Sequence, residues 1–213
     1  MAGGLGVLAA VVGLVFAVSF AGGTRVGGGW FWDFGNALGF LALGGILFQM
    51  IPSARGAATR KHERLGYWAL GVAGAHALWF LVGDGAVRVY LQPGAPVAMW
   101  LGLGAVVGLA LLTSLARMPD RMRVHRRFRT FRTIHRWLGF AVVAAAGLHV
   151  GLTGFYLSRW VQDGLLLVVV LACCLGRQHW ARLATPPVAT GAGFVAVGLV
   201  AAAGFLLLRN LGG

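Results

Sequence analysis

Charged residues are scarce in this sequence, and acidic ones are scarcer still. Only 11% of the 213 residues are charged, and five are Asp or Glu. An average soluble domain has about 25% charged residues, so the composition excludes an ordinary soluble protein. Apolar residues make up 59% of the chain and occur in long runs, as expected of helices that cross a bilayer. We therefore predict a single membrane domain over residues 1–213.

Several motifs are also absent, and each absence excludes a class of function. No G-x-G-x-x-G segment opens a βαβ unit, which argues against a flavin or nucleotide domain. No C-x-x-C-H motif is present, so a covalently attached c-type haem is excluded. The two cysteines, Cys173 and Cys174, are adjacent within an apolar run. They are interpreted as small core residues and not as part of a disulfide framework.

The apolar runs predict an all-α integral membrane protein, a helical bundle of about seven transmembrane helices. A Gly-rich loop with Trp30, Phe31 and Trp32 is expected over residues 22–35, where these rings suit the interfacial aromatic belt. The sixth run is short for a crossing. The predicted spans are 5–21, 36–51, 63–82, 96–115, 136–157, 164–176 and 190–208.

The net charge of +13 comes from Lys and Arg residues that lie between the apolar runs. Membrane topology explains this distribution better than nucleic-acid binding does. With seven crossings, 14 of the 18 basic residues fall on the side of the N-terminus. The positive-inside rule then predicts a multi-pass protein of the cell membrane with a cytoplasmic N-terminus. The eight arginines of residues 116–136, including Arg126, Arg127 and Arg129, either fix this topology, bind anionic lipid or dock an acidic partner.

One pattern occurs twice, as H-x-x-L-G-[aromatic]-x8-H. The first copy runs from His62 to His76 and the second from His135 to His149. On an α-helix, fourteen residues rise about 21 Å and turn roughly 40° short of four full turns. The two histidines of each copy therefore lie on nearly the same face, one near the membrane edge and one well inside.

Two such helices running parallel would place His62 opposite His135 and His76 opposite His149. This arrangement suits two b-type haems, each held by two imidazoles. Ionisable groups inside a membrane are costly and usually functional, and the repeat favours haem binding over chance. The alternatives are that His62 and His135 are solvated flanks, or that a haem-free permease or structural protein uses the histidines for packing or a metal ion.

Further residues near the histidines are candidates for cofactor binding. Gly66 and Gly139 lie four residues after His62 and His135, on the same face. A glycine there would let a macrocycle approach closely, although small residues also serve helix packing. Haem propionates need cations near the interface, and the candidates that flank this end of the pattern are Arg60, Arg64, Arg132 and Arg136. Each of these is equally explained as a topology charge.

These residues resemble the ferric reductase-like transmembrane domain family, which includes the membrane part of NADPH oxidases. The resemblance covers about residues 36–176 and implies two haems on His62, His76, His135 and His149. The chain is also similar to the haem-binding membrane subunit that serves periplasmic methionine sulfoxide reductase. The segments that carry the resemblance are the Gly35–Pro52 span, K-H-E-R-L-G-Y-W from Lys61, Leu111–Ser114 with the basic stretch after it, and the His135–His149 span.

The family resemblance implies transmembrane electron transfer by an oxidoreductase component. A cytoplasmic flavoprotein or a quinol would be the donor, and an acceptor on the outer side would receive the electron. Two features depart from the family: this chain has no flavin and nucleotide domain, and an extra C-terminal span is expected over 187–213. A methionine sulfoxide reductase on the outer side is the alternative acceptor.

Overall fold

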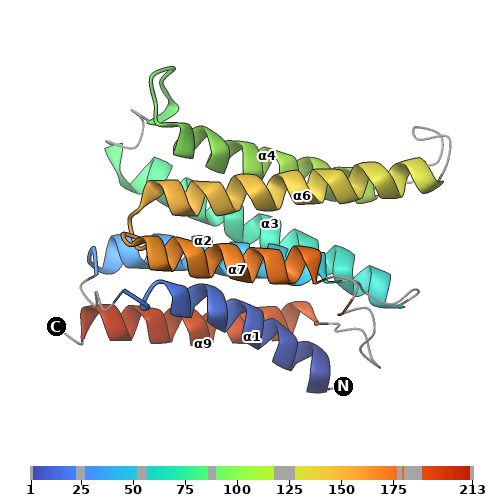
Figure 1. Ribbon diagram of the computed structural model, residues 1–213, viewed down its shortest axis with the longest axis horizontal. Coiled ribbons are helices and arrows are strands. Elements are labelled where there is room, and N and C mark those ends of the chain that lie inside the picture. Colours follow the sequence, from blue (N-terminus) through green and yellow to red (C-terminus); the bar gives the residue numbers. More distant parts are fainter. Residues whose placement is uncertain are drawn as a thin grey trace.

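The computed structural model describes residues 2–22, 27–51, 57–85, 90–117, 128–176, 179 and 189–211. All the regular elements in these ranges are helices, which confirms the predicted all-α class (Figure 1). The seven helices are α1 (Ala2–Val18), α2 (Trp30–Met50), α3 (Ala57–Gly83), α4 (Val97–Arg117), α6 (Phe128–Thr153), α7 (Trp160–Leu175) and α9 (Gly191–Asn210).

Five of these helices are long and apolar enough to cross a membrane, namely α2, α3, α4, α6 and α9. Helices α1 and α7 are apolar but shorter, with 17 and 16 residues. A straight crossing of a bilayer takes about 20 residues, so α7 is short for a span, as the sequence indicated. The fold is therefore that of a membrane helical bundle.

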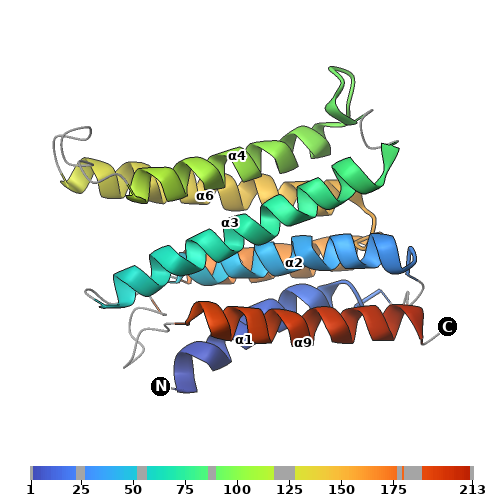
Figure 2. The same ribbon diagram turned by 180° about the vertical axis from the view of Figure 1, so that it is seen from behind.

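Helix α2 is the centre of the bundle. It packs against α1, α3 and α9 and also contacts α6 and α7. Figures 1 and 2 show α4 and α6 on one side of it and α1 and α9 on the other. More than half of its residues are buried, because it is surrounded by helices while the outer helices keep one face free for lipid.

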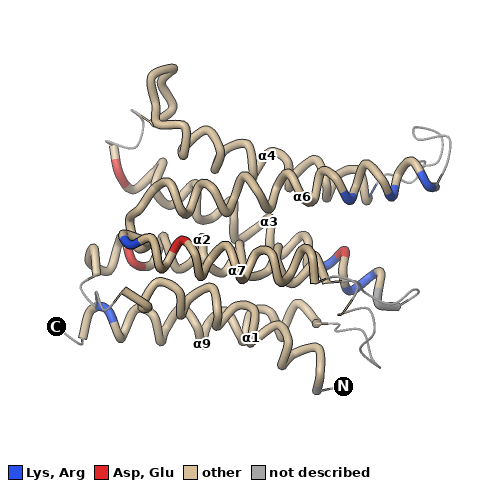
Figure 3. Tube along the Cα trace, viewed as in Figure 1, with Lys and Arg blue, Asp and Glu red and all other residues tan. Residues whose placement is uncertain are grey.

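The two ends of the bundle differ in charge. The chain termini lie at opposite ends (Figure 1), as expected for the seven helices of the described ranges. Basic residues in the first turns of α3 and α6 gather at the end where the N-terminus lies (Figure 3). We call this end the N-side and the opposite end the C-side. Which of the two ends faces the cytoplasm stays a prediction. Residues 118–127, with Arg126 and Arg127, lie outside the described ranges.

The expected loop over residues 22–35 is wrong in its second half. Helix α2 begins at Trp30, so the three aromatic residues form its first turn. Asp33 follows in the same turn, where the positive end of the helix dipole favours a carboxylate. Similarly, α6 ends at Thr153, before the predicted 157, because Gly154 adopts a positive φ of 61°, a conformation that stops helices.

Candidate functional site

The structure places the four repeated histidines in two facing pairs. The ring centres of His62 and His135 are 6.3 Å apart with an angle of 60° between the rings. Those of His76 and His149 are also 6.3 Å apart, with an angle of 74°. Helices α3 and α6 therefore run parallel and in register. We call His62/His135 the N-side pair and His76/His149 the C-side pair.

The spacing within each pair is that of two imidazoles bound to one metal ion from opposite sides. In protein sites, the bond from a metal ion such as zinc to a histidine nitrogen is about 2.0–2.1 Å. In a five-membered ring with sides of about 1.33 Å, each atom lies about 1.1 Å from the ring centre. Two such rings on opposite sides of a metal thus have centres about 6.2–6.4 Å apart. Both pairs have this separation.

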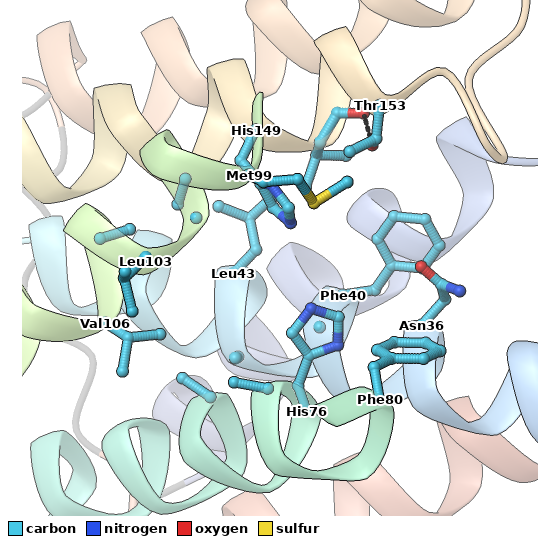
Figure 4. A pocket seen from close by; sticks show the side chains of 18 of the residues that line it. Asn36, Phe40, Leu43, His76, Phe80, Met99, Leu103, Val106, His149 and Thr153 are labelled. Carbon is cyan, nitrogen blue, oxygen red and sulfur yellow. Dashed lines mark hydrogen bonds between the residues drawn. The ribbon is translucent and has the colours of Figure 1, made fainter. Parts of the chain in front are cut away.

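A cavity of about 360 Å³ separates the two rings of the C-side pair. Figure 4 shows His76 and His149 pointing toward one another across it. This volume lies within the range of small-molecule and cofactor pockets, about 300–1,000 Å³. The walls are mainly apolar and come from α2, α3, α4 and α6, with polar groups from Asn36 and Thr153. The cavity can therefore hold a mainly apolar group between the two imidazoles.

His76 is held by the first half of α2. Its Nδ1 atom lies 2.8 Å from the carbonyl oxygen of Gly35. Its ring lies directly over Gly39, where an added Cβ would be 2.9 Å from the ring carbon Cε1. The ring of Phe80 packs at right angles with its centre 5.4 Å away. Because a carbonyl only accepts hydrogen bonds, Nδ1 must donate, and Nε2 keeps its lone pair.

His149 is held by α4 in the same way. Its Nδ1 atom lies 2.7 Å from the carbonyl oxygen of Ala98. An added Cβ on Gly102 would be 2.8 Å from that same Nδ1. Both C-side histidines thus donate from Nδ1 and leave Nε2 as a metal-binding atom, the usual arrangement when a backbone carbonyl orients a metal-bound histidine.

The N-side pair is less completely supported. Both of its rings are partly buried, and the ring of Phe131 stacks on His135 with centres 5.6 Å apart. The Nδ1 atom of His135 is buried and has no hydrogen-bond partner in the described part of the chain. The same holds for Nε2 of Gln49, in the last turn of α2. The N-side therefore contains two buried polar atoms that have no hydrogen-bond partner among the described residues.

The other residues predicted for the site lie around the N-side pair. An added Cβ on Gly66 would be 3.5 Å from Gln49 Nε2, and one on Gly139 would be 3.7 Å from Met50 Sδ. These are ordinary contacts, so both glycines border the last turn of α2 and tolerate a methyl group there. Arg64 and Arg136 are exposed, and the Arg136 guanidinium lies 6.0 Å from the Trp137 ring centre.

A buried polar cluster closes the C-side of the bundle next to the cavity. The Asp33 carboxylate is fully buried and accepts hydrogen bonds from the Tyr156 hydroxyl, from Asn210 Nδ2 at 2.7 Å and from the backbone N–H of Gly28 at 3.2 Å. Tyr156 also lines the cavity. Burial raises the pKa of Tyr156, and the adjoining Asp33 carboxylate raises it further, so the phenol stays protonated and remains a donor.

Arg209 completes this cluster from the last helix. Its side chain is only 5% exposed and donates to the carbonyl oxygen of Ser19 at 2.8 Å. The guanidinium lies 4.5–4.9 Å from the ring centres of Tyr156, Phe20 and Phe205, a favourable cation–π arrangement. The C-side thus buries one carboxylate and one guanidinium close to the same tyrosine.

Sequence reasoning missed the residues that support the C-side pair. Gly39 and Gly102 lie on helices without a repeated histidine, so no spacing within the pattern indicated them. Asp33 falls within the loop expected over residues 22–35, and Arg209 directly follows the last predicted span, 190–208. Their one sequence signal is that each directly adjoins a long apolar run in a chain with very few charges.

The fold and the site define an all-helical membrane protein with two stacked histidine pairs between parallel helices. Comparison of the chain with protein-family models, curated proteins and solved structures gives no match. The family resemblance of the motifs thus stays a hypothesis.

Proposed function

We propose that this protein is a transmembrane electron-transfer protein that binds two b-type haems. One haem would be held by the N-side pair and the other by the C-side pair. The single observation that carries this proposal is the separation of 6.3 Å between ring centres in both pairs. Both pairs lie on α3 and α6, and the spacing of axial ligands recurs at each of them.

The donor set supports haem over a bare metal ion. The described residues contain no cluster of three or more His, Cys, Asp or Glu side chains. A structural zinc site generally needs four protein ligands, whereas each pair here offers two imidazoles on opposite sides. A macrocycle would supply the remaining equatorial ligands, and the apolar cavity between His76 and His149 has room for a flat group.

The haem would supply one-electron chemistry, and the chain would supply its placement. Nε2 of His76 and Nε2 of His149 are the atoms positioned to bind iron, because both Nδ1 atoms are engaged by carbonyls. Apolar side chains such as Leu43 and Val106 line the cavity. Fourteen residues of helix place the two pairs about 21 Å apart along the bundle, so together they reach from one membrane edge toward the other.

For the electron donor we propose a class of partner, and for the electron acceptor a side of the bundle. The N-side carries the exposed basic turns of α3 and α6, which suit a flavoprotein with an acidic docking surface, and a quinol is the other candidate. The acceptor would meet the C-side. The positive-inside rule supports a cytoplasmic donor.

A haem determination on the purified chain tests this proposal directly. We expect a pyridine haemochrome assay to give two b haems per chain and the reduced-minus-oxidised spectrum to show low-spin haem. A colourless protein would reject the proposal. One haem per chain would reject the N-side or the C-side assignment, and substitution of one histidine from each pair would show which.

A further inference from the structure

Helices α2 and α4 carry no repeated histidine, but each contacts one C-side histidine through a backbone carbonyl and a glycine. On α2, the Gly35 carbonyl binds Nδ1 of His76 and Gly39 lies under its ring. On α4, the Ala98 carbonyl binds Nδ1 of His149 and Gly102 lies under that ring. In both cases the glycine follows the carbonyl residue by four positions, one helical turn.

The offset of four residues has a simple geometric reason. In an α-helix every Cα–Cβ bond tilts toward the N-terminus, so the Cβ of residue i+4 lies beside the carbonyl group of residue i. A glycine at i+4 uncovers that carbonyl from the side. The oxygen already accepts the helical hydrogen bond from the N–H of residue i+4, and its second lone pair is then open to an imidazole.

We propose that Gly35/Gly39 and Ala98/Gly102 are positioning elements that set the redox potential of the C-side haem. Small residues four apart in membrane helices ordinarily bring two helix backbones together, but here each such pair receives a side-chain ring. This inference rests on the proposed haem function and extends it to four residues outside the two histidine pairs.

The expected direction follows from ligand basicity. Donation from Nδ1 to a carbonyl makes the imidazole a stronger ligand through Nε2. A stronger ligand stabilises the oxidised iron, so this hydrogen bond lowers the reduction potential. At the N-side pair, Nδ1 of His135 has no such partner among the described residues. On this account the C-side haem has the lower potential of the two.

The test uses the full chain in lipid nanodiscs with the substitutions Gly39→Ala and Gly102→Ala. Each added methyl group would meet an imidazole at 2.8–2.9 Å and push the ring away from its carbonyl. Gly104→Ala on α4 and Gly74→Ala on α3 are matched controls, since an added Cβ at either position has nothing within 4 Å. Potentials are measured by spectroelectrochemistry, and the axial-ligand field of each haem by electron paramagnetic resonance.

We expect Gly102→Ala and Gly39→Ala to raise the C-side potential and to shift its resonance signal, while the N-side haem and both controls stay unchanged. A shift of up to about tenfold in the reduction equilibrium, or 59 mV for one electron, is the size anticipated. Full haem content with an unchanged C-side potential in both variants would overturn the inference.

A measurement on the unsubstituted protein covers the case in which these variants fail to fold. In protein labelled with ¹⁵N-histidine, His76 and His149 should each show a protonated, hydrogen-bonded Nδ1, assigned by loss of the signal in His76→Ala and His149→Ala. A deprotonated or solvent-bonded Nδ1 at both positions would also overturn the inference. Failure of the proposed function is a different result, because the unsubstituted protein would then contain no haem.

Discussion

The two histidine pairs have the same ring separation but very different surroundings. At the C-side pair, both Nδ1 atoms are bound by backbone carbonyls and both rings lie on glycines. At the N-side pair, the Nδ1 of His135 is buried without a described partner. The sequence repeat encodes the spacing along α3 and α6, while the neighbouring helices α2 and α4 decide how firmly each imidazole is held. One motif, used twice, can thus produce two unequal sites.

The largest expected effect comes from removing one ligand of one pair. His149→Ala should eliminate the C-side haem and leave the N-side haem bound, and His135→Ala should do the reverse. The pairs are about 21 Å apart along the helices, so each substitution acts mainly on its own site. Haem-to-protein ratios and difference spectra check this, with His179→Ala as the control, because that side chain is exposed. Loss of both haems from a folded variant would show that there are not two separate sites.

Removal of the buried Asp33 carboxylate should lower the stability of the protein without changing either histidine pair. Asp33→Ala removes the acceptor for the hydrogen bonds of Tyr156, Asn210 and the Gly28 backbone N–H. A buried donor that is left unsatisfied costs about 1–3 kcal/mol. We expect a loss of this size in thermal unfolding of the purified protein. Asp163→Ala, which removes an exposed acid from the first turn of α7, should cost less than about 1 kcal/mol.

Alanine at Gly66 or Gly139, beside the N-side pair, should have only a small effect on haem content and stability. Gly66→Ala and Gly139→Ala add methyl groups at ordinary contact distances of 3.5 and 3.7 Å. Alanine also favours a helix interior over glycine by up to about 1 kcal/mol. We expect unchanged haem content and equal or slightly higher stability. If either variant instead lost the N-side haem, these glycines would be needed for close approach of the macrocycle.

The smallest expected effect is on the rate of haem reduction, when charges on the N-side or the C-side are removed. Reduction by an acidic donor protein should slow as ionic strength rises, because complementary charge mainly speeds encounter and salt screens it. Replacing the exposed Arg60 and Arg129 with Gln should slow reduction by a few fold at low salt. Arg159→Gln, an exposed charge on the C-side, should not. Stopped-flow reduction that ignores both salt and the N-side substitutions would assign these arginines to topology alone.

The fold class and the pairing of the histidines could be predicted because both depend on regular spacing. Long apolar runs give membrane helices, and a spacing of fourteen residues keeps His62 and His76 on one face of α3. The boundaries were less predictable. Trp30 and its neighbours suit an interface equally well in a loop or in a first helical turn, and composition does not separate the two.

The support of the C-side pair was not predictable from sequence, because it depends on which helices become neighbours. Gly39 is one of many small residues in this chain, and only the packing of α2 on α3 places it under His76. Likewise, Asp33 and Arg209 are 176 positions apart in the sequence, and the docking of α9 against α1 and α2 brings them into one cluster.

This long separation also bears on how the protein is made. Helix α2 is synthesised early, and its Asp33 then has neither Tyr156, Asn210 nor Arg209 beside it. An unpaired carboxylate within a membrane is costly. Tyr156 is made before the last helix, whereas Asn210 and Arg209 lie on α9. A chain interrupted before α9 would carry the histidines of both pairs and still lack two members of the cluster around Asp33.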